Sequence, residues 1–526
     1  MSNRFPRLGA YIRHVGGYLT DCIRIDTRSL AVFRVLVGLL VVADVILRSR
    51  NFLLYYTDDG VVPEALAREH TSEYAVSVFY LSSEPSIIAV LFLAGLLLAL
   101  CLIVGYRTRT VTALTFLFVV SLDHHNPFVL SYSDTLFRLL LFWALFLPLG
   151  ERWSVDAVHT DREPRRSVAG LATFLALGQM VFMYFLNGVH KTESELWRSG
   201  EATPLIFGID EMTFLLGEVL GAFPTLLTYG GLLWFYMLLG SWLLFVLRGR
   251  LRLLLVALFF GGHLAFALTV RIGAFAYVAM AGLVLFLQAP FWRDSHRLAR
   301  CLGVDPWTIV PRKTAYEAAA VFPPVRILPA RYDGLKRTAD GLTRGLLVLG
   351  LVLILVVFLL NPGPIVTDGY DQHRLNHEVA ETTGGDHLYA VAEGLGVTQP
   401  EWSVFAPHPR TTDRYYVFGA VTADGDRLDV FNDRPFTWDR PGRLQNQHDT
   451  YRERFFMNSV RRAGASGELP THLAEHICTV YEDEHGIELS HISMFEVTED
   501  ITSETITDPT ERETDRNHFH RHTCRG

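Results

Sequence analysis

Residues 183–200 read MYFLNGVHKTESELWRSG, and they close an apolar segment that extends over residues 168–189. About 20 apolar residues in a row are enough for a helix to cross a lipid bilayer. This segment ends in His190 and Lys191, and Lys191 is the only lysine among the first 312 residues. The stretch therefore predicts a membrane-spanning helix that carries an isolated amine at its end.

Lys191 has two interpretations. Arginine keeps its proton at neutral pH, whereas a partly buried lysine can release its proton and act as a base. The chain has 47 lysines and arginines, and only three of them are lysines, so the choice of an amine here contrasts with the rest of the chain. Alternatively, Lys191 is a helix-end residue whose aliphatic stem lies in the membrane while its charge reaches the interface.

The rest of the chain contains further apolar runs of similar length. Half of the residues are hydrophobic and the mean hydropathy is positive, as is typical of a membrane protein. Candidate spans cover residues 30–47, 86–105, 111–122, 134–150, 168–189, 224–247, 253–270, 272–287 and 345–360. The sequence therefore predicts a polytopic α-helical membrane protein with about nine transmembrane helices.

Some spans carry polar side chains, which are costly in a bilayer and usually face the protein interior. Asp134 and Arg138 lie four residues apart in the fourth span, so they can pair on one helix face. His263 lies deep in the seventh span. It is either a buried hydrogen-bonding group or part of a functional site, because polar groups inside membranes are enriched at such sites.

The distribution of arginine predicts the orientation, because cytoplasmic loops carry an excess of Lys and Arg. Residues 1–29 and the connection 293–344 are basic, whereas the loop 123–133 contains neither residue type. We therefore expect a multi-pass protein of the plasma membrane. It would have a cytoplasmic N-terminal segment (1–29), a transmembrane domain (30–361) and an extracellular C-terminal part.

The C-terminal part has the composition of an acidic soluble domain. Residues 362–526 contain 29 Asp and Glu, 15 Arg and no Lys, which argues against a nucleic-acid partner and favours a high-salt environment such as that of a halophilic archaeon. Residues 413–421 and 427–431 read as strands around an Asp-Gly turn, 450–462 and 471–484 as helices, and 487–497 as a strand. A mixed α/β domain is therefore expected over 362–509.

Residues 510–526 are charged, and we expect them to form a flexible tail. They include His518, His520, His522 and Cys524, which could gather as metal ligands, but the tail interpretation predicts no metal site. Cys478 and Cys524 could form a disulfide if this part is extracellular, although their spacing does not require one.

Five stretches, taken together, resemble the HTTM family, the membrane domain shared with vitamin K-dependent gamma-carboxylase. They are YYTDDGVVP (55–63), HHNPFVLSYSDTLFRLLLFWALFLPLGERWSVDA (124–157), YFLNGVHKTESELWRSG (184–200), HLAFALTVRIGAFAYVAMA (263–281) and QPEWSVFAPHPR (399–410). The resemblance extends over most of the chain from residue 30 to about residue 497. The combined order is more specific than any single stretch.

The resemblance implies an activity, namely oxidation of a lipid hydroquinone to its epoxide, coupled to carboxylation of a polypeptide glutamate. Lys191 stands at a position similar to that of the family's base, and His263 resembles the histidine of the seventh span. Trp402 begins a stretch similar to one that closes over the quinone site. The substrate-binding residues expected on this basis are His190, Trp197, Trp402 and Asp134.

The same resemblance implies a reduced, menaquinone-like quinone, O2 and CO2 or bicarbonate as reactants. The implied partners are the lipid bilayer, the quinone and an exported polypeptide. The chain also departs from the carboxylases: Ser133 or Asp134 stands where they have a histidine before the fourth span, and His190 replaces a second lysine. The alternative function is therefore a non-catalytic membrane protein that binds a lipid, a quinone or an exported polypeptide.

Overall fold

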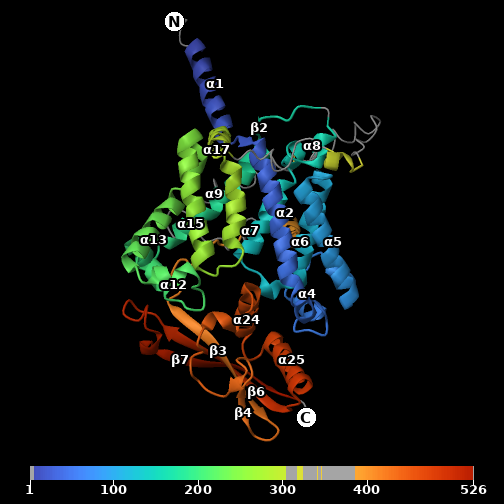
Figure 1. Ribbon diagram of the computed structural model, residues 1–526, viewed down its shortest axis with the longest axis vertical. Helices are drawn as coiled ribbons and strands as arrows, with labels where there is room; N and C mark the ends of the chain where they lie inside the picture. The colour runs from blue at the N-terminus through green and yellow to red at the C-terminus, as the bar shows by residue number, and fades with distance from the viewer. Residues whose placement is uncertain are drawn as a thin grey trace.

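The computed structural model describes residues 5–160, 162–303, 317–323, 341, 345 and 385–524. A bundle of helices stands on a C-terminal domain that is built on a five-stranded sheet (Figure 1). The expected ninth span, 345–360, lies almost wholly outside the described residues. The same holds for most of the basic connection before it.

Ten helices of nine or more residues precede the C-terminal domain in the described part of the chain. They are α1 (Phe5–Cys22), α2 (Thr27–Ser49), α5 (Pro85–Val104), α6 (Thr108–His125), α7 (Tyr132–Ala144), α9 (Leu171–Lys191), α13 (Pro224–Leu239), α15 (Gly249–Thr269), α16 (Phe275–Leu283) and α17 (Ala289–Cys301). The connections contain α3 (Phe52–Tyr56), α4 (Glu64–Glu69), α8 (Val155–Val158), α10 (Glu195–Ser199), α11 (Ala202–Phe207), α12 (Leu216–Gly221) and α14 (Leu243–Val246). Short 3₁₀ turns are η1 (Val78–Leu81), η2 (Pro127–Val129), η3 (Leu149–Glu151) and η4 (Val284–Phe286), and β1 (Ile25–Asp26) pairs with β2 (Ser167–Val168).

Four of the described helices, α2, α5, α9 and α15, are long and apolar enough to cross a membrane. A fifth candidate is the pair formed by α16–η4 and α17, which is bent by 102°. The spans expected at 134–150 and 224–247 are shorter, because α7 has 13 residues and α13 has 16, fewer than the roughly 17–25 that a bilayer requires. The protein is thus a helical membrane protein, and the nine predicted spans are not confirmed.

Local sequence signals account for where the helices begin and end. The Asp26 carboxylate accepts a hydrogen bond from the Arg28 amide (2.9 Å) and caps α2. Ser131 and Asp134 form a reciprocal capping box at the start of α7. Gly105 ends α5 in the left-handed conformation (φ 71°), which glycine adopts without steric cost.

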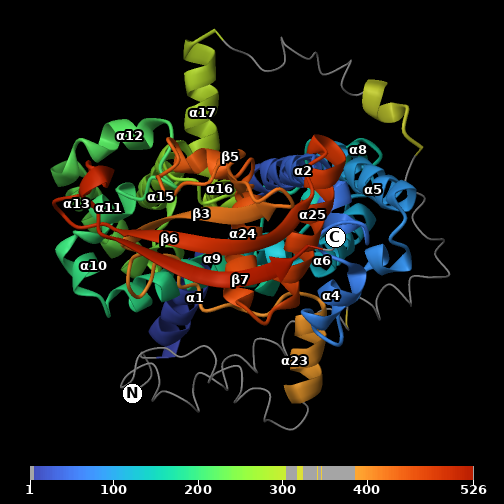
Figure 2. The same cartoon turned by 90° about the horizontal axis from the view of Figure 1, so that it is seen from below.

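The C-terminal domain contains the predicted strands and helices. Its antiparallel sheet has the order β5 (Arg434–Pro435), β4 (Arg427–Asp429), β3 (Thr412–Thr422), β6 (Leu489–Asp500) and β7 (Thr514–Thr523). The other elements are α23 (Gly385–Gly394), α24 (Tyr451–Ala463), α25 (Glu468–His485), η6 (Leu444–Gln447) and η7 (Pro509–Glu511). Strands β3, β6 and β7 run side by side across the lower end of the bundle (Figure 2), and α24 packs against η2 of the bundle.

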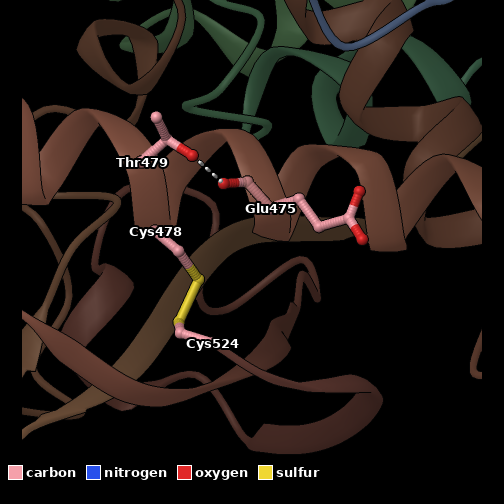
Figure 3. Close-up of a disulfide and its surroundings, with 4 residues drawn as sticks. All are labelled: Glu475, Cys478, Thr479 and Cys524. Carbon is pink, nitrogen blue, oxygen red and sulfur yellow. Dashed lines mark hydrogen bonds between the residues drawn. A yellow bond between two sulfur atoms is a disulfide. The ribbon is translucent and has the colours of Figure 1, made fainter. Parts of the chain in front are cut away.

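Most of the stretch expected as a flexible tail, 510–526, is ordered, and only its residues 525–526 lie outside the described part of the chain. Residues 514–523 form β7 along β6, with Phe519 and His520 both buried beside a bulge in the register. Their charge content suggested solvent exposure, but burial of Phe519 and pairing of the backbone outweigh it. The disulfide between Cys478 and Cys524 then ties the end of β7 to α25 (Figure 3).

Candidate functional site

One face of α9 carries the polar residues around Lys191. Tyr184, Asn187 and Lys191 are spaced at i, i+3 and i+7, so they share a face of the helix. Gly188 lies against α13, where an added Cβ would come within 2.8 Å of the Leu239 amide nitrogen. A glycine is therefore needed for the close approach of α9 and α13.

The 399–405 loop of the C-terminal domain lies along α9. Gln399 exchanges two hydrogen bonds with Gln179, of 3.0 and 2.6 Å, and accepts a third from the Trp402 indole nitrogen at 3.0 Å. Asn187 donates to the carbonyl oxygens of Trp402 (2.7 Å) and Val404 (3.0 Å). Gln179 and Lys191 are separated by about 18 Å along a helix axis, at 1.5 Å per residue. The loop is thus inserted deep into the bundle.

Lys191 binds the end of this loop. Its Nζ donates to the carbonyl oxygens of Val404 (2.6 Å) and Phe405 (3.1 Å), and it lies 3.9 Å from the centre of the Trp197 ring. The Trp197 indole nitrogen donates to the same Phe405 oxygen at 2.8 Å. Lys191 is only 2% exposed. The amine therefore lies in a closed environment of two carbonyl groups and an aromatic face.

The backbone of the loop is strained on both sides of these contacts. Trp402 and Phe405 have φ angles of 53° and 52°, in the left-handed region that costs a bulky residue on the order of 1–3 kcal/mol. Such conformations persist only where the surroundings hold them. The hydrogen bonds from Asn187 and Lys191 to the carbonyls at 402–405 supply that restraint.

His263 is buried on α15, near the same face of α9. Its Nε2 shares a 2.8 Å hydrogen bond with the Tyr184 hydroxyl, and the Trp234 ring meets it edge-on at 5.2 Å between centroids. Within the described part of the chain its Nδ1 has no hydrogen-bond partner. Only one of the two ring nitrogens of His263 is therefore hydrogen-bonded among the described residues.

Four of the six predicted site residues line a single cavity of about 460 Å³, namely Lys191, His263, Trp197 and Trp402. Most of the other lining side chains are apolar. Leu226, Leu233 and Leu258 line it as well, and they are 58%, 54% and 41% exposed on the surface of α13 and α15. The cavity therefore opens toward the surroundings of these two helices, which in a membrane is the lipid.

His190 is not among the residues that line this cavity. Its Nε2 is hydrogen-bonded to the Glu401 carbonyl oxygen (2.9 Å), and its Nδ1 lies 3.9 Å from Glu193. Glu195 pairs with Arg198. The two glutamates that follow Lys191 in the sequence therefore interact with other side chains, and His190 helps to hold the inserted loop.

Asp134 lies elsewhere, at the edge of a larger cavity of about 1200 Å³. The expected pairing with Arg138 is wrong, because Arg138 binds Asp123 (2.7 Å). Asp134 binds Arg452 of α24 at 2.9 Å and approaches Arg48 at 3.5 Å. The Asp134 carboxylate therefore contacts the C-terminal domain through Arg452, which is far away in the sequence, and it belongs to a buried ion network.

Sequence reasoning missed several groups that shape the site. Tyr184 and Asn187 could have been found, because helical spacing places them on the face of Lys191. The carbonyl acceptors of Val404 and Phe405 could not, since every residue has a carbonyl group and only the path of the loop selects these two.

A family model, the HTTM domain, matches residues 23–292, just over half of the chain. The match includes Lys191, Trp197 and His263 but not the inserted 399–405 loop. No curated protein and no solved structure matches the chain. The extent of the family match is sufficient to assign the bundle, and with it the protein: the chain belongs to the HTTM domain family.

Proposed function

We propose that this HTTM protein binds a lipid hydroquinone in the 460 Å³ cavity and oxidises it with O2, with Lys191 as the base. One observation carries the proposal: Lys191 and His263 line the same largely apolar cavity, which opens between α13 and α15. A hydroquinone ring with an isoprenoid chain could enter there from the bilayer. The overall reaction is hydroquinone plus O2 to quinone epoxide plus water.

The surroundings of Lys191 suit an amine that takes up a proton. A neutral amine has two N–H groups, which match the carbonyl acceptors at Val404 and Phe405 and leave its lone pair available. When the amine accepts the phenolic proton, the face of Trp197 at 3.9 Å stabilises the resulting cation. The neighbouring glutamates are engaged with His190 and Arg198, so neither holds the amine permanently charged.

His263 would orient the ring. If the Tyr184 hydroxyl donates to Nε2, the unpaired Nδ1 carries a proton and can donate to a ring oxygen. Coupling of the oxidation to carboxylation of a polypeptide glutamate by CO2, and menaquinone as the quinone, are further parts of this proposal. The competing function is binding without chemistry, in which Lys191 only clamps the 399–405 loop to α9.

We also propose that the C-terminal domain is extracellular and the N-terminus cytoplasmic. The arginine-rich connections lie at the end of the bundle away from that domain, and disulfides such as Cys478–Cys524 persist in oxidising compartments. Labelling of engineered cysteines in intact cells tests this orientation. Label that reaches a cysteine placed in 293–303 but not one placed in 423–426 would overturn it.

The enzymatic proposal is tested with the full chain in lipid nanodiscs, supplied with reduced menaquinone, O2, bicarbonate and a Glu-containing peptide. Quinone epoxide is the expected product, and gamma-carboxyglutamate reports the coupled step. Lys191→Arg keeps the charge but removes the titratable amine. It should lower epoxide formation by at least about 10²-fold, as expected when a general base is lost.

Gln179→Met is the matched control, because Gln179 holds the same loop through Gln399 but does not line the cavity. If Lys191 is only a clamp, the control and Lys191→Arg should behave alike. Oxidation at the wild-type rate in Lys191→Arg would remove the catalytic role. Binding of menaquinone without any epoxide would favour the non-catalytic alternative.

A further inference from the structure

A strongly basic cavity lies at the end of the bundle opposite the C-terminal domain. Its volume is about 610 Å³, within the roughly 300–1,000 Å³ that is typical of small-molecule sites. The basic residues among its described lining are Arg24, Arg28, Arg152, Arg166 and Arg248. Among the described lining residues, only Asp21 and Asp26 oppose these arginines, so this described set has an excess of three positive charges. The neighbouring elements α1, β2 and α17 meet at the upper end of the bundle in Figure 1.

Both carboxylates are already engaged. Asp26 caps α2 and binds Arg28 at 2.7 Å, and Asp21 is shared between Arg24 (3.1 Å) and Arg248 (3.2 Å). The Arg152 guanidinium donates to the Thr27 hydroxyl at 2.7 Å rather than to a carboxylate. Arg166 forms no ion pair with any residue that the structure describes. The remaining positive charge is therefore available to an anion from outside the chain.

Aromatic residues beside this cavity suit the level of lipid headgroups. The Arg28 guanidinium lies 5.5 Å from the Trp292 ring, and Trp292 meets Trp153 edge-on at 5.8 Å. Trp153 is 50% exposed on the surface. Tryptophan is enriched where a membrane protein passes from the hydrocarbon region to water. The aromatic residues beside the basic cavity are therefore those expected at a membrane interface rather than in open solvent.

The larger cavity of about 1200 Å³ forms an apolar groove next to the basic cavity. Arg28 stands one helical turn before Val32 on α2, and the same stripe of α2 continues through Leu36 and Leu40. Those three apolar residues line the 1200 Å³ cavity, as does Trp292 beside Arg28. A molecule with a charged head at the arginines could therefore place a hydrocarbon chain along α2.

We propose that the basic cavity binds the phosphate of an anionic membrane lipid, with one hydrocarbon chain of that lipid in the groove along α2. Guanidinium groups bind phosphate through charge-assisted hydrogen bonds that can be bidentate. Basic sites between membrane helices bind anionic headgroups on the same principle. This inference rests on neither Lys191 nor the quinone proposal.

The test measures thermal unfolding of the purified full chain in detergent micelles at about 100 mM salt, where charges are screened beyond about 10 Å. Phosphatidylglycerol, phosphatidylcholine or inorganic phosphate is added in turn. A ligand of the folded state raises the midpoint, and phosphatidylglycerol should raise it by at least about 2 °C. Phosphatidylcholine should not. Equal shifts with the two lipids would overturn the proposal without recourse to any variant.

Substitutions in the basic cavity test whether phosphatidylglycerol raises the unfolding midpoint by binding there. Arg24→Gln with Arg166→Gln removes two charges from the cavity and should abolish the shift. Arg250→Gln with Arg297→Gln is the matched control, because these side chains are 77% and 68% exposed, lie near Asp294 and do not line the cavity. An undiminished shift in the cavity variant would overturn the proposal. If inorganic phosphate alone raises the unfolding midpoint by the full amount, the site binds free phosphate and the proposal of a lipid ligand is overturned.

Discussion

Lys191 and Trp197 donate hydrogen bonds to the same acceptor, the carbonyl oxygen of Phe405, while the amine lies 3.9 Å from the centre of the indole ring. One strained residue of the C-terminal domain thus fixes both side chains. The ring is well placed to stabilise a cation on Nζ. If Lys191 changes its protonation state during turnover, Trp197 favours the protonated form.

Replacement of Trp197 separates these two roles. Trp197→Phe keeps an aromatic face but loses the indole N–H, whereas Trp197→Leu loses both. A cation–π contact in a desolvated site is worth up to about 2 kcal/mol. We expect Trp197→Leu to slow hydroquinone oxidation by roughly 10- to 30-fold, and Trp197→Phe by clearly less. Single-turnover rates in nanodiscs provide the measurement, and equal losses in both variants would show that only the hydrogen bond to Phe405 matters.

The disulfide yields a prediction about the last strand. Cys478 and Cys524 are 46 residues apart in the sequence, and in the chain-entropy model such a crosslink is worth about 4 kcal/mol. Reduction, or Cys524→Ser, should therefore raise the hydrogen exchange of the β7 amides and lower the unfolding midpoint. Cys301→Ser is the control, because Cys301 is free and exposed. Unchanged β7 exchange after reduction would mean that pairing with β6 alone holds the strand.

Much of the bundle could be predicted from sequence, because continuous apolar runs mark α2, α5, α9 and α15 directly. The strands β3 and β4 followed from two strand-like runs around an Asp-Gly turn, and a third such run at 487–497 predicted β6. Contacts between residues that are far apart in the sequence leave no local sequence pattern from which they could be predicted. Asp134 binds Arg452, which lies 318 residues away in the sequence. Residues 510–526 looked like a tail because they are charged, and their composition does not reveal that residues 514–523 pair with β6.

The same limit applies to the candidate site. Lys191 stood out by its rarity, and His263 by its polarity in an apolar helix. The resemblance placed the stretch from Trp402 over the site, but the contacts that hold the 399–405 loop could not be deduced, since backbone carbonyls accept its hydrogen bonds. Asp134 was assigned to the substrate by analogy, whereas its neighbours make it part of an ion network.

Glu211, between α11 and α12, should make the protein acid-sensitive. Burial alone would raise the pKa of its carboxyl group, but the guanidinium groups of Arg410, Arg454 and Arg414 outweigh burial and hold the pKa at about 2. The ordinary value is 4.5. A pKa that is lower in the folded state stabilises the protein above the unfolded-state pKa, and this stabilisation is lost as pH falls toward the folded-state value.

The shift corresponds to a stabilisation on the order of 3 kcal/mol at neutral pH. Glu211→Gln should therefore be markedly less stable than the wild type at pH 7. The difference should shrink as the pH falls from 4.5 toward 2, because the wild-type carboxylate becomes protonated. Denaturant unfolding of both proteins in detergent at several pH values measures this difference. A difference that does not change with pH would contradict the proposed state of Glu211.

The contact between the C-terminal domain and the bundle should depend on Arg452. This side chain of α24 binds Asp44 of α2 and Asp134 of α7, and all three are largely buried. Arg452→Met would leave two buried carboxylates with too little positive charge, which typically costs about 3–5 kcal/mol. We expect faster proteolysis between the bundle and the domain, and faster hydrogen exchange in α24. Adding Asp44→Asn removes one of the two carboxylates that then share Arg48 and should recover part of the loss, since residues in one network are energetically coupled. If the double variant is as unstable as the sum of the single variants, the two side chains act independently and the ion network does not hold the domain in place.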